Sequence, residues 1–346
     1  MRYYLHYILA LLVLCTACSQ APSDYLYASG SMLGTTYHIK ADLPIDLCGE
    51  VEQCALRLDA QMKSEMSIFD TLSRLSLINA NRCDSLTEAL EFNIRLADSI
   101  SRLSGGLYDI TVAPLVKAWG FVAKSDMVTA PNVDSLLEFV GHQGLAIENG
   151  RLIKVDERMQ IDLNSIAKGY TVDRLAAELE AMGARNYMVD IGGEIRLRGV
   201  NPSGMAWRIG IETPFDGNMS EGAFLERRIA LPDSLPWRAV ATSGNYRRFH
   251  ITDDGRKVVH TINPITGASS PSALLSATVL APTCALADAY ATMLMAAGDQ
   301  HAERLAEQIT NCEVYLIYNR GARMRGTEDL YEVYFSNGMQ QMLLED

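Results

Sequence analysis

Apolar positions along the chain follow two periods, one typical of helices and one typical of strands. Leu86, Leu90 and Ile94 recur at near-helical spacing, which predicts an amphipathic helix. With Gly183 and Gly298 as stop signals, the same criterion predicts helices over residues 44–64, 84–103 and 165–182 and from Pro282 to Gly298. Alternating apolar and polar residues predict strands over residues 35–40, 186–191, 194–200, 207–212, 237–242, 247–252, 257–262 and 276–281.

Two turn residues, Asn149 and Gly150, separate apolar-alternating runs between residues 144 and 163. Asn-Gly is a strong signal for a two-residue hairpin loop, so we expect a β-hairpin here. Helices and strands mix along the chain without strict β-α-β alternation, which predicts an α+β fold with mixed or antiparallel sheets. The sequence contains neither GxGxxG nor GxxxxGK[ST], which excludes the two common nucleotide-binding loops.

The net charge and the cysteine spacing narrow the kinds of molecule that this protein could bind. The formal net charge is −12, without a run rich in Lys and Arg, which argues against a nucleic-acid surface. Beyond residue 18 the cysteines are Cys48, Cys54, Cys83, Cys284 and Cys312, and their spacing does not fit a zinc site. Cys48 and Cys54 could pair in an oxidising compartment, or the cysteines could be small buried hydrophobes.

The first residues have the composition of an export signal. Arg2 precedes an apolar run over residues 8–14, which is too short for a confident membrane span. The following "CTAC" resembles the lipobox of bacterial lipoproteins, with Cys18 as the lipidated residue, although Cys15 stands where the pattern prefers Leu. The alternative is an exported soluble protein with ordinary signal cleavage. We expect a signal peptide over residues 1–17, a tether over 18–26 and one domain over 27–346.

An acid in the middle of an apolar helix is the first candidate for chemistry. "ALADAYATMLMAAG" (285–298) places Asp288 and Thr292 one turn apart on one helix face. A carboxylate and a hydroxyl are oxygen ligands of the kind that Mg²⁺ prefers. Alternatively, a core hydrogen bond satisfies Asp288, and Thr292 bonds back to its own helix.

A second candidate lies in "QIDLNSIAKGYTVDRLAAEL" (160–179). A strand ends at Leu163 and a helix begins near Asn164 or Ser165, so its free N–H groups could hold a phosphate. Lys168 lies in the first turn, where a cation is unfavourable unless an anion is nearby. A capping serine and an exposed lysine are the simpler interpretation.

Two further stretches carry candidate groups. In "VVHTINPITGAS", His260 ends a strand before a turn and could act as a general base near neutral pH. It could equally be a strand-end hydrogen-bonding residue. In residues 104–121 a Gly pair precedes Tyr108 and Asp109, an arrangement that suits a planar ligand or a packed loop.

Eight ordered blocks together resemble the ApbE-type FAD:protein FMN transferases, from about residue 27 to the C-terminal region. These blocks are "LGTTYHI" (33–39), "MSIFDTLSRLSLIN" (66–79), "GGLYDITVAPLVKAWGF" (105–121), "IDLNSIAKGYTVDRL" (161–175), "VDIGGEIRLRG" (189–199), "AVATSGNYRRF" (239–249), "HTINPITG" (260–267) and "ADAYATMLMAAG" (287–298).

This resemblance implies an exported, often lipid-anchored enzyme that binds FAD as substrate and needs Mg²⁺. Such enzymes cleave FAD, attach FMN through a phosphoester to a Thr or Ser of a partner protein, and release AMP. The acceptor carries a D-x-x-(S/T)-G-A-(T/S)-type motif and is an exported or membrane redox protein. The expected location is the bacterial cell envelope, on the periplasmic side of the inner membrane. The implied fold is the family's α+β fold in two closely packed parts, with FAD between them.

The resemblance also implies roles for individual residues. His260 matches the base that deprotonates the acceptor hydroxyl. Ser165, Asp288 and Thr292 match the family's metal ligands. The residues that match the family's FAD-contacting positions are Leu33, Phe69, Leu107, Tyr108, Asp109, Asp162, Lys168 and Ile262.

The sequence departs from the family pattern at several of these blocks. Leu33 replaces a usual Met, Phe69 a usual Tyr and Asn263 a usual Asp, and Asn164-Ser165 replaces a Gly-rich pair. The Asn263 substitution would matter if an acid there orients His260. Two other functions share the same residues: a Mg²⁺-dependent FAD pyrophosphatase that releases FMN and AMP, and a lipid-anchored protein that binds FAD without chemistry.

Overall fold

The computed structural model describes residues 25–122, 130–215, 224–246, 249–252, 255–269, 272–319 and 331–344. Cys18 and the expected signal peptide lie outside these residues, as does most of the expected tether. Tyr25 and Leu26, assigned to the tether above, are buried in the fold. Within the described part of the chain, no helix has both the length and the apolar character needed to cross a membrane.

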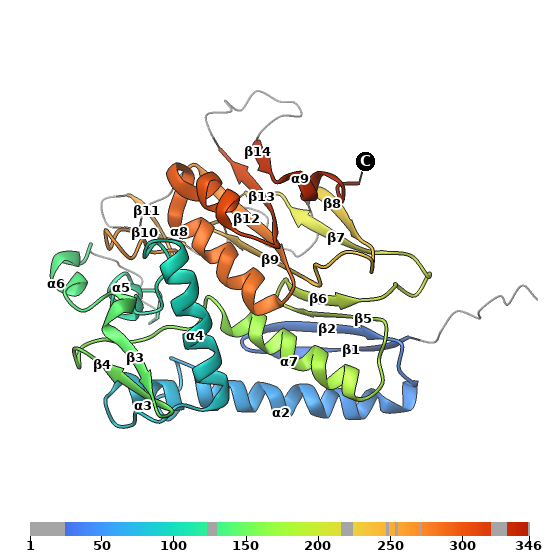
Figure 1. Ribbon diagram of the computed structural model, residues 1–346, viewed down its shortest axis with the longest axis horizontal. Helices are drawn as coiled ribbons and strands as arrows, with labels where there is room; N and C mark the ends of the chain where they lie inside the picture. Colours follow the sequence, from blue (N-terminus) through green and yellow to red (C-terminus); the bar gives the residue numbers. More distant parts are fainter. Residues whose placement is uncertain are drawn as a thin grey trace, which may run out of the picture.

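One large antiparallel sheet runs through the molecule (Figure 1). Every pair of neighbouring strands described in it is antiparallel, which confirms an α+β fold with antiparallel sheets. In spatial order its strands are β1 (Leu26–Met32), β2 (Thr35–Ala41), β5 (Tyr187–Ile191), β6 (Glu194–Arg198), β9 (Ala239–Gly244), β12 (Leu274–Ala281), β13 (Glu313–Tyr318) and β14 (Glu332–Phe335).

Among the described residues, three hairpins lie outside this sheet. They are β3 (Leu145–Glu148) with β4 (Arg151–Lys154), β7 (Trp207–Glu212) with β8 (Leu225–Leu231), and β10 (Phe249–Ile251) with β11 (Lys257–Val259). The first of these is the hairpin predicted from Asn149 and Gly150, and both residues have the positive φ of its turn (50° and 73°).

The described helices vary widely in length. They are η1 (Ile45–Leu47), α2 (Cys48–Met66), α3 (Arg74–Asn79), α4 (Glu88–Leu103), α5 (Ala113–Ala118), α6 (Val133–Leu137), η2 (His142–Gly144), α7 (Ala167–Ala181), α8 (Cys284–Gln308) and α9 (Asn337–Gln340). In Figure 1 the long helix α8 lies against β9 and β12, while α7 and α2 lie below β1 and β2 in this view.

Each face of the sheet has its own hydrophobic core. On β13, Val314 and Leu316 pack into the core formed with the long helices. Tyr315 and Ile317 point to the opposite face and pack with β7, β8 and α9. Because successive strand residues face opposite sides, this strand is apolar at nearly every position.

The start of one predicted helix is wrong, and the predicted stop of another is confirmed. The helix expected over 84–103 begins only at Glu88, because residues 84–86 pair with the β3–β4 hairpin: the N–H of Leu86 donates to the carbonyl of Gly150, and Ser85 bridges Arg151. The stop expected at Gly298 is confirmed: this residue is non-helical, with φ of 65°, and it separates the predicted helix from a second helical segment that runs to Gln308.

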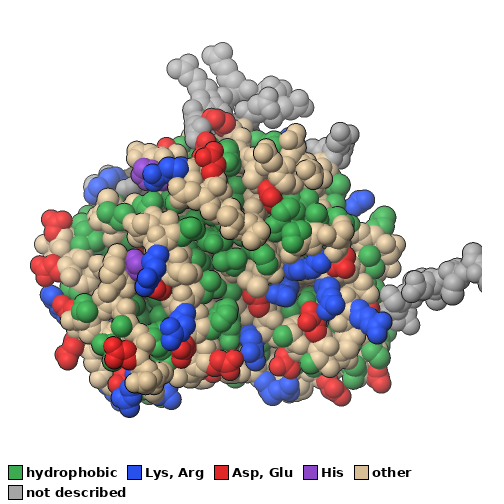
Figure 2. Space-filling model, viewed as in Figure 1, with side chains coloured by type: hydrophobic (Ala, Val, Ile, Leu, Met, Phe, Trp, Pro, Cys, Tyr) green, Lys and Arg blue, Asp and Glu red, His purple; other side chains and the backbone are tan. Residues whose placement is uncertain are grey.

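The distribution of charged side chains on the surface and the burial of the cysteines are those of an ordinary globular protein. On the face shown in Figure 2, acidic and basic side chains alternate over the lower half rather than forming a basic patch. The five described cysteines are all free thiols, so Cys48 and Cys54 are not paired in this structure. Cys54 and Cys284 are buried, as expected of small hydrophobes.

Candidate active site

A single cavity of about 820 Å³ brings the predicted site residues together. Its wall comes from the β1–β2 turn, the ends of α2 and α4, the start of α7, the segment after β11, and α8. Every residue assigned above to FAD, metal or catalysis lines it: Leu33, Phe69, Leu107, Tyr108, Asp109, Asp162, Ser165, Lys168, His260, Ile262, Asp288 and Thr292.

Leu33 reaches the cavity from a tight hairpin turn. Met32 pairs with Thr35, so Leu33 and Gly34 form a two-residue loop with φ of 50° and 80°. A positive φ is unfavourable for a leucine, and a hydrogen bond helps to hold it: the Leu33 N–H donates to Oδ1 of Asp59 on α2 at 2.8 Å. The turn is therefore fastened to α2 at the edge of the cavity.

Phe69 is a large apolar side chain left open to solvent beside the cavity. It is 58% exposed, and it follows α2 in a turn where Oγ of Ser67 accepts the N–H groups of Phe69 and Asp70. An exposed aromatic ring beside a cavity suits stacking on a planar ligand.

The segment after α4 supplies one wall. Gly105 and Gly106 have φ of 63° and 85°, which turns the chain back toward the cavity. The Tyr108 N–H donates to Oγ of Ser104, and the Tyr108 hydroxyl lies 2.9 Å from Oγ of Ser165. Burial raises the pKa of Tyr108 well above its usual range, so this hydroxyl is protonated at neutral pH.

The start of α7 differs from the expectation by two residues. The helix begins at Ala167, no side chain caps it, and Ser165 lies in the preceding turn. The capping-serine interpretation is therefore wrong, because the Ser165 hydroxyl bonds to Tyr108 instead. Oδ1 of Asp162 accepts the N–H of Asn164 at 2.8 Å, and the backbone N–H of Asp162 donates to the carbonyl of Ile110.

Asp288 is buried, at 3% exposure, on α8 beside the first turn of α7. Its Oδ2 accepts the backbone N–H of Gly169 at 3.0 Å. A Cβ added to Gly169 would lie 2.3 Å from the carbonyl oxygen of Cys284, so only glycine allows this approach. Burial raises the pKa of Asp288, and Lys168 and the Gly169 N–H partly offset the shift.

Glu194 is a neighbour of this acid that sequence reasoning assigned no role. It begins β6, is 4% exposed, and its Oε1 accepts a hydrogen bond from the ammonium of Lys168. Its Oε2 is buried without a hydrogen-bond partner. Burial raises the pKa of Glu194 to about 7, and the attraction of Lys168 opposes that shift. The available signal was an acid beside a Gly pair in the block 189–199.

The oxygen atoms around Asp288 fit a hard cation. Thr292 does not bond back to its own helix but lies with its hydroxyl 3.2 Å from Oγ of Ser243 on β9. Together with Ser165 it lines the cavity beside Asp288, so the donor set is a carboxylate and hydroxyls, as Mg²⁺ prefers. Among the described residues, no group of three His, Cys, Asp or Glu side chains is placed to hold a metal ion, so hydroxyl oxygens would have to complete the ligand set around Asp288.

His260 and Ile262 enter the cavity from the segment after β11. The His260 ring packs edge-on against Phe121 at 6.4 Å between ring centres. Oδ1 of Asn263 accepts the N–H groups of Ile265 and Thr266, which shapes the turn after His260. An aspartate would make the same two bonds, so this part of its role is preserved here.

The cavity thus combines an apolar and aromatic side with a polar end. Aromatic and aliphatic side chains can hold a planar ring, while Lys168 and the oxygens near Asp288 can hold a phosphate with its counter-ion. His260 lines the same cavity and could accept a proton there. This combination suits a flavin nucleotide and a reaction at its phosphates.

Comparisons with known proteins agree on one relationship. The model of the ApbE family matches residues 33–316. The FAD:protein FMN transferase of Vibrio cholerae is 36% identical over 310 residues, covering 86% of this chain and 89% of that protein. The Haemophilus influenzae enzyme of the same name is 34% identical, with 88% and 90% covered. The solved flavin transferase ApbE from Vibrio cholerae superposes with a TM-score of 0.77 at 32% identity, covering 92% of this chain and 99% of that one.

Proposed function

Because this chain belongs to the ApbE family, we propose that it is an FAD:protein FMN transferase. The reaction takes FMN from FAD, attaches it through a phosphoester to a Thr or Ser of a partner protein, and releases AMP. The observation that carries this proposal is the single cavity lined by all twelve described residues that the sequence assigns to the reaction. Its volume, about 820 Å³, lies within the range of about 300–1,000 Å³ typical of small-molecule sites.

FAD is proposed to lie with its ring among the aromatic and apolar side chains and its pyrophosphate toward Lys168. The ammonium of Lys168 is held by Glu194, so its position is fixed before substrate binds. The start of α7 has no side-chain cap, but the N–H groups of Ala167 and Gly169 already donate to the Leu163 carbonyl and to Asp288. This leaves the backbone N–H of Lys168 for a phosphate oxygen.

Magnesium dependence is also part of the proposal. Asp288, Thr292 and Ser165 would hold the ion. When bound, Mg²⁺ supplies positive charge that offsets the charge of the pyrophosphate. Burial raises the pKa of both Asp288 and Glu194, and the one ammonium nearby, Lys168, only partly opposes these shifts, so a cation bound beside Asp288 would favour its ionised form.

His260 is proposed as the general base. The acceptor hydroxyl passes its proton to the imidazole as its oxygen forms a bond to the FMN phosphorus. The bridging P–O bond of the pyrophosphate breaks, and AMP leaves with that electron pair. One P–O bond therefore forms as another breaks. The residues contribute positioning and charge stabilisation rather than a covalent intermediate.

Anchoring at Cys18 is a separate proposal, supported by the signal-like segment over residues 1–17. The protein would be tethered on the periplasmic side of the inner membrane of the bacterial cell envelope, near membrane redox proteins. Radiolabelled palmitate and membrane fractionation test it: Cys18→Ala should lose the label and leave the membrane fraction. Retention of the label would contradict lipidation at Cys18.

Intact-protein mass spectrometry tests the transferase directly. The protein without residues 1–18 is incubated with FAD, Mg²⁺ and a small acceptor domain carrying a D-x-x-(S/T)-G-A-(T/S) motif. A mass gain of one FMN on the acceptor, abolished by a chelator, supports the proposal. Free FMN and AMP with an unmodified acceptor would favour a pyrophosphatase instead, and bound but intact FAD would favour a carrier.

A further inference from the structure

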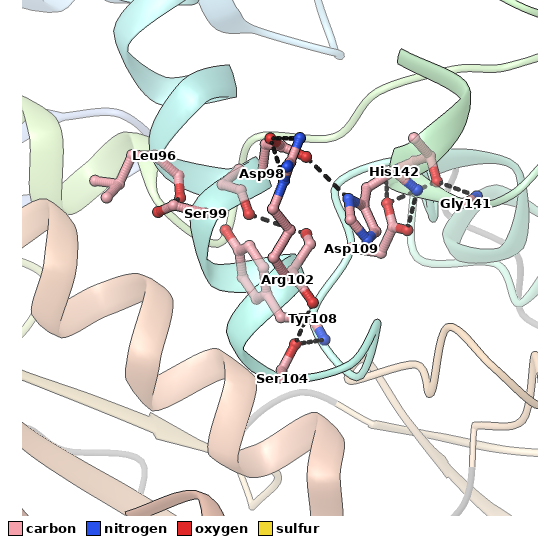
Figure 3. Close-up of polar contacts among 12 residues, drawn as sticks. Leu96, Asp98, Ser99, Arg102, Ser104, Tyr108, Asp109, Gly141 and His142 are labelled. Carbon is pink, nitrogen blue, oxygen red and sulfur yellow. Dashed lines mark hydrogen bonds and ion pairs between the residues drawn. The ribbon is translucent and has the colours of Figure 1, made fainter. Parts of the chain in front are cut away.

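A buried histidine outside the cavity is bonded to one of the cavity walls. His142 lies in η2 and is 7% exposed, yet it is not among the described residues that line the flavin cavity. Its backbone N–H donates to Oδ2 of Asp109 at 2.6 Å. Figure 3 shows the imidazole between Asp109 on one side and Asp98 of α4 on the other.

The carboxylate of Asp109 holds its own segment in place. Oδ1 accepts both the N–H and the hydroxyl of Thr111, each at 2.7 Å, and Oδ2 accepts the His142 N–H. The Thr111 hydroxyl in turn accepts the N–H of Gly141 at 2.8 Å. Both oxygens of Asp109 are therefore engaged with protein groups, although the residue borders the cavity.

The imidazole of His142 is itself fixed from the surface helix. Its Nδ1 lies 2.9 Å from Oδ1 of Asp98, and the other oxygen of Asp98 pairs with Arg102 at 2.9 Å. On the outer side, Asp98 and His142 border a separate hollow of about 490 Å³. The contacts thus run from partly exposed Asp98 to the buried imidazole of His142, and from the backbone N–H of His142 to Asp109 in the cavity wall.

We propose that His142, held by Asp98, is a positioning residue for the flavin-binding wall, fixing the 107–111 segment through its N–H bond to Asp109. The proposal rests on FAD occupying the cavity, as argued above. Asp109 is 7% exposed, and a buried carboxylate that loses a donor is costly, so the wall shifts when the His142 backbone moves. Tyr108, adjacent in that wall, would then lose its alignment with Ser165.

Four variants separate this role from general stability. His142→Ala and Asp98→Ala each remove one partner of the side-chain contact between His142 and Asp98. His142→Asn places an amide nitrogen close to the position of Nδ1 and should restore the bond to Asp98. Arg102→Ala removes the other partner of Asp98 and serves as the matched control.

Two readouts are measured on each variant. Hydrogen exchange of the ligand-free protein reports the amides of residues 107–112, and titration reports the Kd for FAD in the presence of Mg²⁺. We expect both alanine variants to exchange faster at Thr111 and to bind FAD about tenfold more weakly, the effect of losing one charge-assisted hydrogen bond. His142→Asn should recover most of this loss, and Arg102→Ala should match the wild type.

Unchanged exchange or unchanged FAD affinity in Asp98→Ala would overturn the proposal. This variant also keeps the test decisive if His142→Ala fails to fold, because Asp98 is partly exposed on α4. Failure of the wild type to bind FAD would instead refute the proposed function. The exchange rates would then still show whether His142 holds the 107–111 segment.

Discussion

The backbone N–H of Gly169 donates to Oδ2 of Asp288 at 3.0 Å, which joins the first turn of α7 to the second turn of α8. The two helices come from segments more than one hundred residues apart. Their contact brings Lys168, adjacent to Gly169, and Asp288 to the same end of the cavity. The site therefore depends on how closely the two helices pack.

A side chain at residue 169 should separate these helices. In Gly169→Ala the new Cβ would collide with the carbonyl of Cys284, so we expect a loss of about 1–3 kcal/mol in the free energy of unfolding. FAD turnover should fall as well, because Asp288 loses its donor. Urea denaturation and steady-state kinetics measure the two effects.

Gly49→Ala is the matched control for this substitution. Gly49 also lies in a helix, α2, but a Cβ there would meet no atom within 4 Å. Alanine should be neutral or slightly stabilising at this position. Equal stability losses in the two variants would show that the contact between α7 and α8 is not the cause.

The pair formed by Lys168 and Glu194 should be energetically coupled. Glu194→Gln leaves the ammonium without its anion, and Lys168→Met leaves a buried carboxylate unpaired. Lys168 is one-third exposed, so we expect a modest coupling of about 1–2 kcal/mol in a double-mutant cycle of unfolding free energies. Additive losses would mean that the two groups do not stabilise each other.

Asp173 of α7 caps the start of α8. Its two carboxylate oxygens accept the N–H groups of Cys284 and Ala285, each at 2.9 Å, and Arg196 pairs with the same carboxylate. Asp173→Ala should cost about 1–2 kcal/mol and lower Tm, because the helix that carries Asp288 loses its cap. Arg196→Met keeps the cap and should cost less. A larger loss in Arg196→Met would assign the stabilisation to the ion pair instead.

Stability in acid should depend on Asp98. Burial raises the pKa of Asp98, but hydrogen bonds from His142 and Arg102 outweigh it and hold this pKa below its usual range. The ionised carboxylate therefore stabilises the fold above its unfolded pKa, and this contribution is lost as pH falls through the folded value. Urea denaturation between pH 6 and pH 3 should show a shallower acid loss in Asp98→Asn than in the wild type. Parallel curves would contradict the assignment.

Local patterns predicted much of the fold because they act within a few residues. Asn149 and Gly150 supply the positive φ that their hairpin needs, and the residues of α7 and α2 repeat with a helical period. Strand β13 was missed because it is buried on both faces, and its continuous apolar run carries no alternation. Pairing of β2 with β5, far apart in sequence, depends on the whole sheet.

The candidate site was predictable where its residues form recognisable blocks. Asp288 and Thr292 share a helix face by their spacing alone, and the resemblance supplied residues from the other elements. Glu194 was missed because its one signal, an acid beside a Gly pair in the block 189–199, does not show what it contacts. His142 was missed because it is a single polar residue without a periodic or motif signal. Their roles arise from contacts with Lys168 and Asp98, which only the folded chain brings within hydrogen-bonding distance.

The most direct test of the proposed reaction compares two histidines that both contact Phe121. His260 lines the cavity, whereas His250 stacks on the same ring at 4.6 Å and does not border the cavity. Transfer of FMN to the acceptor and the Kd for FAD are measured for His260→Ala, His250→Ala and the wild type. We predict that His260→Ala binds FAD but transfers no FMN, and that His250→Ala transfers normally. FMN transfer at the wild-type rate by His260→Ala would contradict the account.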